Sequence, residues 1–203
     1  NLTDNDSLTV SPWMAVGLAS DSSYKEFDLA VNYAHTIEAL TLGLGYTFYD
    51  TWKEDVTSFQ NEINASVAYN FDLGFMKLTP SVTYFYNLGP DDSQGRKDNG
   101  DVTSYVGAVS RSASYLSLRL DGSIAINDRI SLAPYVAYGH NYRVNSKVTN
   151  DQLDEFNGSN NVEYGVAAPF KINNTISVSA YIAQSIAFQE LGNAVGSDTR
   201  QFT

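Results

Sequence analysis

The residues of this chain that could do chemistry are charged side chains that recur on one parity of alternating segments. In each segment every second residue is apolar and the charges fall between, so a strand would place them all on one side. Arg119 and Arg143 lie on neighbouring segments, with Asp121 close to Arg119. Opposed acidic and basic groups can form a polar constriction that selects small solutes by charge and size; ion pairs that only fill a narrow interior are the alternative. The charges of this face are Glu26, Asp28, Glu62, Lys77, Arg119, Asp121, Arg143, Glu163 and Lys171.

Other chemistries lack their residues. The chain has no Cys and two His, so we expect no thiolate chemistry, no disulfide and no His-rich metal site. His140 falls on the apolar parity and His35 in a short link, and neither has a Ser and an Asp at a defined spacing, so no enzyme and no cofactor are predicted. Asp151, Asp154 and Glu155 are weak cation ligands without the regular alternation of a calcium loop. Solvated loop charge is the favoured interpretation, and no metal site is predicted.

Length and charge bound the class and the partners. A net charge of -11 argues against nucleic acid, which requires a basic surface. Evenly spaced segments over 203 residues predict one domain, 1–203, with a loose segment at 1–7 and a loop or the start of a closing strand at 190–203. The chain starts at Asn1 without a basic-then-apolar leader, which we interpret as a signal peptide already removed or never included.

The elements that would position the charges are β-strands. In 40–49 the even positions are Leu, Leu, Leu, Tyr and Phe, and the odd positions are Thr, Gly, Gly, Thr and Tyr, so the apolar period is two. One face is large and apolar, and the other is small or hydroxylic. The same plan predicts nine strands, at about 10–19, 26–34, 40–49, 59–71, 76–87, 116–126, 130–143, 162–172 and 176–188.

The links between these strands alternate in length. Those at 35–38, 72–75, 127–129 and 173–174 are short, whereas those at 50–57, 88–113 and 145–160 are long, polar and partly acidic. An up-and-down meander places all its short turns at one end of the sheet, so this alternation predicts one.

Aromatic residues of the apolar parity gather near both ends of the strands and suggest two girdles. Strands of roughly ten to thirteen residues suit a tilted bilayer crossing better than a soluble sandwich, whose strands run about five or six. Every backbone polar group must be paired in a membrane, so such a sheet has to close on itself. The girdle residues are Tyr33, Tyr46, Phe48, Tyr69, Phe71, Tyr84, Tyr86, Tyr138, Tyr142, Phe170 and Phe188.

Over residues 8–189 the pattern resembles bacterial outer-membrane β-barrel proteins of the small-porin kind. The run Gly43-Leu44-Gly45-Tyr46-Thr47-Phe48-Tyr49 also resembles a family of outer-membrane proteins with a Gly-x-Gly-Tyr-x-x-Tyr strand. Such barrels usually have an even strand number and end on a strand with a terminal aromatic, yet nine strands are read here. We therefore expect closure through chain beyond Thr203, a partner or an unrecognised strand, with Phe202-Thr203 as the first residues of a closing strand.

Four prolines lie inside predicted strands and remove backbone donors from the sheet. They are Pro12, Pro80, Pro134 and Pro169. We expect β-bulges near the short-turn end to accommodate them.

The sequence thus predicts an all-β, transmembrane, up-and-down antiparallel β-barrel of about ten and at most twelve strands. The predicted function is a passive channel for small polar solutes in the bacterial outer membrane. Its partners would be the lipid bilayer with its outer-membrane lipids, and either another protein or a second copy of the chain. A structural or adhesive barrel with a plugged lumen, acting through the acidic loops 88–113 and 145–160, is the first alternative. A soluble β-sandwich that binds a ligand is the second.

Overall fold

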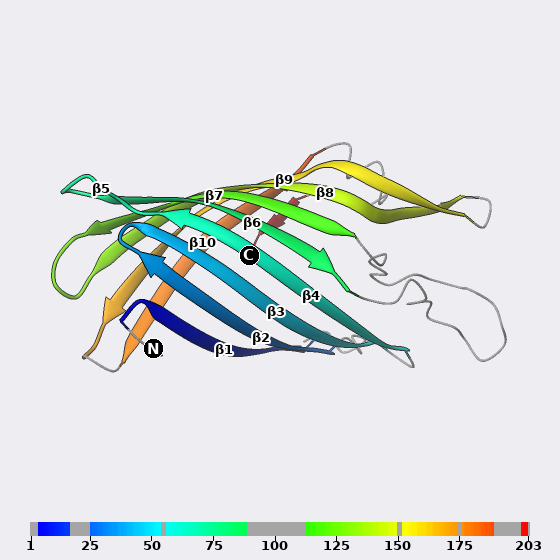
Figure 1. Cartoon of the computed structure of the whole chain (residues 1–203), viewed down its shortest axis with the longest axis horizontal. Helices are drawn as coiled ribbons and strands as arrows, with labels where there is room; N and C mark the ends of the chain where they lie inside the picture. The colour runs from blue at the N-terminus through cyan, green and yellow to red at the C-terminus, as the bar shows by residue number, and fades with distance from the viewer. Residues whose placement is uncertain are drawn as a thin grey trace.

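The computed structural model of the chain is one curled antiparallel sheet (Figure 1). It describes residues 4–16, 25–53, 56–88, 113–149, 152–173, 176–188 and 200–202. No helix that could cross a membrane is found in these ranges. The strands are β1 (Asp6–Val16), β2 (Lys25–Ile37), β3 (Leu40–Lys53), β4 (Val56–Tyr69), β5 (Phe71–Asp72), β6 (Lys77–Asn87), β7 (Ser114–Ala125), β8 (Ser131–Thr149), β9 (Gln152–Lys171), β10 (Ser177–Ala187) and β11 (Arg200–Phe202).

Each strand pairs with its neighbours in sequence. The order across the sheet is β1-β2-β3-β4-β6-β7-β8-β9-β10-β11, and the two-residue β5 pairs with β6. In the described ranges nine strands have eleven or more residues, and they correspond to the nine segments expected from the alternation. The all-β fold and the antiparallel up-and-down order are therefore confirmed. β1 begins at Asp6, within the segment 1–7 that was expected to be loose.

The register keeps the apolar residues of neighbouring strands on one face. Val31 of β2 lies opposite Tyr46 of β3, and Tyr33 lies opposite Leu44. The two strands are joined at Glu38 and Ala39, where Glu38 has a φ of 55°. A slip of one residue would turn every apolar side chain of one strand to the other face, so the alternation itself fixes this register.

The two faces of the sheet differ sharply in chemistry. The outer face carries large apolar side chains that are well exposed, including Met14 at 71%, Leu44 at 63% and Ile182 at 70%. The inner face, around which the sheet curls, carries the small and polar residues. Among the described residues the buried hydrophobic side chains are only Ala113 and Ala183. This sheet therefore has no conventional apolar core between packed layers in the part of the chain described.

Two of the three links predicted to be long polar loops contain paired strand instead. The predicted loop 50–57 is mostly taken up by β3, which runs to Lys53, and β4, which starts at Val56. The predicted acidic loop 145–160 is a hairpin in which β8 continues to Thr149 and β9 starts at Gln152. Backbone pairing needs only an adjacent strand, and polar β-branched residues such as Thr support it, so side-chain polarity misplaced these boundaries. The predicted loop 88–113 falls outside the described residues except at its ends.

Each of the four prolines is paired with one neighbouring strand and has no described ladder pair on its other side, and no register shift occurs at these positions, in contrast to the bulges that were expected. Pro80 lies in the gap between the β4 and β5 pairings of β6, and Pro134 lies opposite Gly122 in a gap of the β7–β8 ladder. Pro169 lies beyond the β8–β9 ladder, and Pro12 is in β1, whose only described neighbour is β2. In the described residues, register shifts occur instead between Tyr138 and Val148 of β8, where it pairs with β9. An interrupted ladder removes the need for the missing N–H without changing the register.

The described strands leave the sheet open. β1 pairs with β2 alone, and no described residue of β1 pairs with β10 or β11. Nine alternating strands make β1 and β10 point the same way, so antiparallel closure requires another strand between them. β11 runs antiparallel to β10, with Phe202 opposite Gln184 and Arg200 opposite Ile186. It lies where the closing strand was expected to begin.

Candidate functional site

Five of the nine predicted charges of the inner face lie towards the middle of the sheet, and four lie towards its margins, among them Glu26, the second residue of β2. Lys77 and Lys171 are exposed at strand ends next to the short turns. Arg143 is exposed, has a φ of 56° and lies at a register shift in β8. Arg119 pairs with Ala137, six residues before Arg143, so the two arginines are roughly 20 Å apart along the strand direction. The two arginines lie on neighbouring strands, as predicted, but they do not face each other.

Arg119 is the centre of a compact polar cluster on β7, β8 and β9. Its guanidinium binds the Asp121 carboxylate through Nε at 2.9 and 2.8 Å and through Nη2 at 2.8 Å. Its Cζ lies 4.0 Å from the centre of the Tyr135 ring. The Tyr135 hydroxyl in turn donates to Glu163 Oε1 at 2.7 Å. We call Arg119, Asp121, Tyr135 and Glu163 the arginine cluster.

Two different interactions hold Arg119 in this cluster. The carboxylate of Asp121, two residues along the same strand face, forms charge-assisted bonds in a fork geometry. The Tyr135 ring attracts the cation through its π face. Both partners are half-exposed in the ion pair, with side chains 38% and 40% accessible, so water reaches this cluster. The Arg119 guanidinium is held in place and still contacts water. It can therefore interact with an ion that passes along the inner face.

A second cluster of polar side chains, which includes several carboxyl groups, lies on β2, β3 and β4. Asp28 faces Tyr49 across the β2–β3 pairing, and the Tyr49 hydroxyl donates to Glu62 Oε1 at 3.2 Å. Asp28 Oδ1 is buried and has no hydrogen-bond partner among the described residues. Glu26 occupies the same face two residues before Asp28 and is half-buried. Among the described residues, this side of the inner face therefore carries three carboxyl groups, on β2 and β4.

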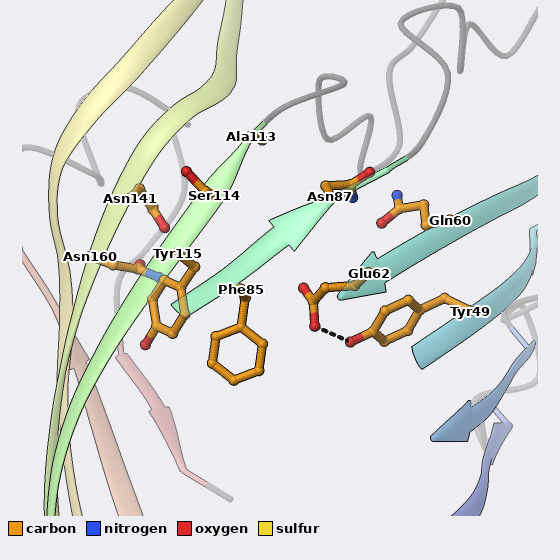
Figure 2. A pocket seen from close by; sticks show the side chains of 10 residues that line it. All are labelled: Tyr49, Gln60, Glu62, Phe85, Asn87, Ala113, Ser114, Tyr115, Asn141 and Asn160. Atoms are coloured by element: carbon orange, nitrogen blue, oxygen red, sulfur yellow. Dashed lines mark hydrogen bonds between the residues drawn. The ribbon is translucent and has the colours of Figure 1, made fainter. Parts of the chain in front are cut away.

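Between the two groups the inner face is hollowed. The hollow has a volume of about 550 Å³, and Figure 2 shows the side chains that line it. Its walls come from six strands, β3, β4, β6, β7, β8 and β9, and from the residue before β7. The lining residues are Tyr49, Gln60, Glu62, Phe85, Asn87, Ala113, Ser114, Tyr115, Asn141 and Asn160.

Aromatic rings and carboxamides dominate this lining. The rings of Phe85 and Tyr115 lie side by side, with centroids 5.8 Å apart and planes at 44° (Figure 2). Asn87 and Asn141 are only 5% and 6% exposed, so the surrounding strands fix their positions. Among the lining residues Glu62 is the one with an ionisable carboxyl, and none carries a positive charge. The sequence analysis identified Glu62 here but missed the other lining residues.

A glycine makes room for one wall of the hollow. A Cβ built on Gly139 of β8 would overlap the ring and hydroxyl of Tyr115. The Tyr115 ring therefore lies over Gly139 and reaches towards β9, where its hydroxyl is 3.4 Å from Asn161 Oδ1. The small residues of the inner face thus provide space for the large ones on the next strand.

The predicted girdle residues lie on the outer face. Tyr46 and Tyr86 flank Ile63 across β3, β4 and β6, and Tyr138 makes an edge contact with Phe188 at 6.0 Å between centroids. Those with well-exposed side chains are Tyr33, Tyr46, Tyr69, Phe71, Tyr84, Tyr142, Phe170 and Phe188. Phe48, Tyr86 and Tyr138 are half-buried.

The histidines and the weak metal candidates form no centre in the described part of the chain. His35 Nδ1 lies 2.9 Å from Asp6 Oδ1 at the margin of β1–β2, and the His140 ring lies against Tyr142. No group of three His, Asp or Glu among the described residues is arranged to hold a metal ion. Asp151 lies outside the described residues, and Asp154 and Glu155 lie in a part of β9 where the backbone alone is described.

Comparison with known proteins adds no relative. No protein family matches the sequence, and no curated protein matches it either. The function must therefore be inferred from the residues and their geometry.

Proposed function

We propose that this protein is an integral β-barrel of the bacterial outer membrane and that it lets small polar solutes diffuse passively through its interior. The observation that carries the proposal is the exposed apolar outer face of a one-layer sheet. Burying a side chain such as Leu44 or Ile182 is worth about 1.5–3 kcal/mol. A protein whose outer face is in water lacks this stabilisation at each exposed apolar position. Soluble monomers rarely expose a continuous apolar surface of this kind. Lipid acyl chains remove the penalty.

Strand length and the aromatic bands support the same environment. The nine long strands have 11 to 20 residues, and about 9–11 residues are enough for a tilted crossing of a bilayer. Tyrosine and phenylalanine side chains near both strand ends suit the two interfaces of a membrane, where an aromatic ring contacts acyl chains and a hydroxyl contacts water. A soluble sandwich would instead cover its apolar face with a second sheet.

The inner face supports the transport part of the proposal. It has half-exposed charges, small residues and a hollow of about 550 Å³, whereas a plugged interior would be filled by side chains. In this proposal the arginine cluster lines the path and biases it by charge. A monovalent ion about 4 Å from the Arg119 charge would experience about 1 kcal/mol in a water-like dielectric, which is about a fivefold effect on its partition.

The test is single-channel conductance of the detergent-purified protein in a planar bilayer. We expect steady openings, and we expect Arg119→Ala, alone or with Arg143→Ala, to raise the preference for cations by about fivefold or less, because salt screens the charge. Arg129→Ala is the matched control, since it removes a positive charge from a short turn away from the cluster. A stably inserted but silent protein would contradict the channel. A chain that stays monomeric in buffer without detergent would contradict the membrane assignment.

One observation favours a second function, adhesion through a projecting hairpin. The β7–β8 pairing ends at Ser114 and Tyr142, and the β9–β10 pairing ends at Asn161 and Ala187. β8 and β9 continue together beyond both neighbours as a two-stranded ribbon (Figure 1). A silent barrel whose partner binding is abolished by shortening 144–156 would favour this function over transport.

A further inference from the structure

The hollow on the inner face has a lining that distinguishes between classes of polar solute. We infer that it is a binding subsite for a neutral sugar or similar polyhydroxyl compound. This inference rests on the proposed function, because it names the solute class that would pass through the same interior. It is argued from the lining residues alone.

Hydrogen-bond donors and acceptors are balanced in the lining. The side chains of Asn141 and Asn160 each offer an amide N–H₂ and a carbonyl oxygen, and Gln60 and Asn87, which also have partners within the protein, add two further carboxamides. A sugar hydroxyl donates one hydrogen bond and accepts others, so it can use both halves of a carboxamide. A lining built from carboxamides therefore matches hydroxyl groups better than it matches a group that only donates or only accepts.

The second argument is the charge of the lining. Glu62 is its one ionisable carboxyl and accepts a hydrogen bond from Tyr49 at 3.2 Å, and no Lys or Arg lines the hollow. An anionic solute would meet a carboxylate without a compensating cation. A divalent cation would find one carboxylate where an all-oxygen site usually needs several. A neutral solute meets neither difficulty, and the Glu62 carboxylate can accept a hydrogen bond from one of its hydroxyl groups.

The third argument is the flat apolar surface beside the amides. Phe85 and Tyr115 present neighbouring rings, and Tyr49 lies across the hollow from them (Figure 2). A sugar ring has one face of C–H groups, which packs on an aromatic ring, while its edge carries the hydroxyls. A volume of about 550 Å³ falls within the range of about 300–1,000 Å³ that is typical of small-molecule sites.

The experiment measures binding in detergent micelles, separately from conductance. Glucose and maltose serve as neutral probes and gluconate as the anionic probe, each titrated by calorimetry. We expect the neutral sugars to bind and gluconate to bind at least about tenfold more weakly. We expect Phe85→Leu, which keeps apolar volume but removes the ring, to weaken sugar binding about tenfold. Phe48→Leu makes the same change outside the hollow and should leave binding unchanged.

A second variant covers a failure of Phe85→Leu to fold. Gln60→Glu keeps the size of a half-buried side chain, removes its two N–H donors, and should also weaken sugar binding. The inference is overturned if gluconate binds as well as glucose, if no sugar binds, or if Phe48→Leu has the same effect as Phe85→Leu. Conductance separates the two proposals: an open channel without sugar binding refutes this inference alone, and sugar binding by a silent barrel supports it while contradicting transport.

Discussion

Replacing Gly165 with alanine should destabilise the sheet, whereas the same replacement at Gly43 should not. Both glycines lie in strand interiors on the inner face, and both have ordinary strand backbones. They differ in what a methyl group would meet. This difference makes them a matched pair.

The methyl group at Gly165 would meet atoms that cannot move away. It would lie 2.7 Å from the carbonyl oxygen of Ile182, 2.8 Å from Cβ of Ala183 and 2.9 Å from the Tyr135 ring. The first two atoms belong to β10 or are fixed to its backbone, and Tyr135 is held by Arg119 and Glu163. Overpacking of this kind costs typically about 1–3 kcal/mol. At Gly43 the one close atom is the Ser66 hydroxyl, which rotates freely, and the next contacts are 3.7 and 3.8 Å away.

Alanine also gains stability at both sites because it loses less backbone entropy than glycine, by roughly 0.5–1 kcal/mol. The Gly43 variant should therefore be equal to or slightly more stable than wild type. The Gly165 variant should be less stable by about 1–2 kcal/mol, a net value from the same two effects. The expected separation between the variants is about 2 kcal/mol.

The assay is equilibrium urea unfolding of the protein held in lipid, followed by circular dichroism and by the fluorescence of Trp13 and Trp52. With a slope of about 1–3 kcal/mol per molar urea, 2 kcal/mol moves the midpoint by about 1 M. Equal midpoints for the two variants would refute the reasoning. So would a Gly165 variant as stable as wild type, because the close contacts with β10 would then be wrong.

Three other variants test single interactions by the same unfolding assay or by conductance. Asp28→Asn should raise the free energy of unfolding by about 1 kcal/mol, because Asp28 Oδ1 is buried without a described hydrogen-bond partner and the amide carries no charge; a loss of stability would contradict this. Asn127→Ala should lower the free energy of unfolding by about 1 kcal/mol, because Asn127 Oδ1 accepts hydrogen bonds from the backbone N–H groups of Arg129 and Ile130, both at 2.9 Å. Asn127→Asp should be near wild type in stability because the acceptor oxygen remains. Tyr135→Phe keeps the ring beside Arg119 but removes the 2.7 Å bond to Glu163, so it should cost about 1.5–3 kcal/mol and make currents more cation-preferring; unchanged stability and selectivity would speak against the arginine cluster.

The sequence predicted the elements well because strand periodicity is local. The alternation in 40–49 is enough to assign a strand and its apolar face, and the bond between Arg119 and Asp121 follows from two residues on one side of one strand. Strand ends were less predictable. Residues 145–160 read as a loop because they are polar, but pairing with the adjacent chain satisfies their backbone.

The site could be predicted only in part because it depends on register between strands. Arg119 lies opposite Ala137 and not opposite Arg143, and a sequence that places both arginines on neighbouring strands does not contain this register. The contact of Arg119 with Tyr135 and the bond from Tyr135 to Glu163 need the registers of β7, β8 and β9 together. The hollow needs six strands, and no short stretch of sequence contains that information.

The pairing of every strand with its sequence neighbours also has a consequence for how such a chain can grow or shrink. The smallest unit that can be removed while preserving the antiparallel order of the remaining described strands is a hairpin, because deleting one strand would leave two parallel neighbours side by side. The turns at Asn127 and Asn173 are built alike, with each side-chain oxygen accepting from the backbone N–H three residues later at 2.9 and 2.8 Å. In a hairpin closed by such a turn, hydrogen bonds within the turn itself determine where the chain reverses direction. Inserting or deleting one changes the circumference of the sheet in steps of two strands and leaves the registers of the others intact.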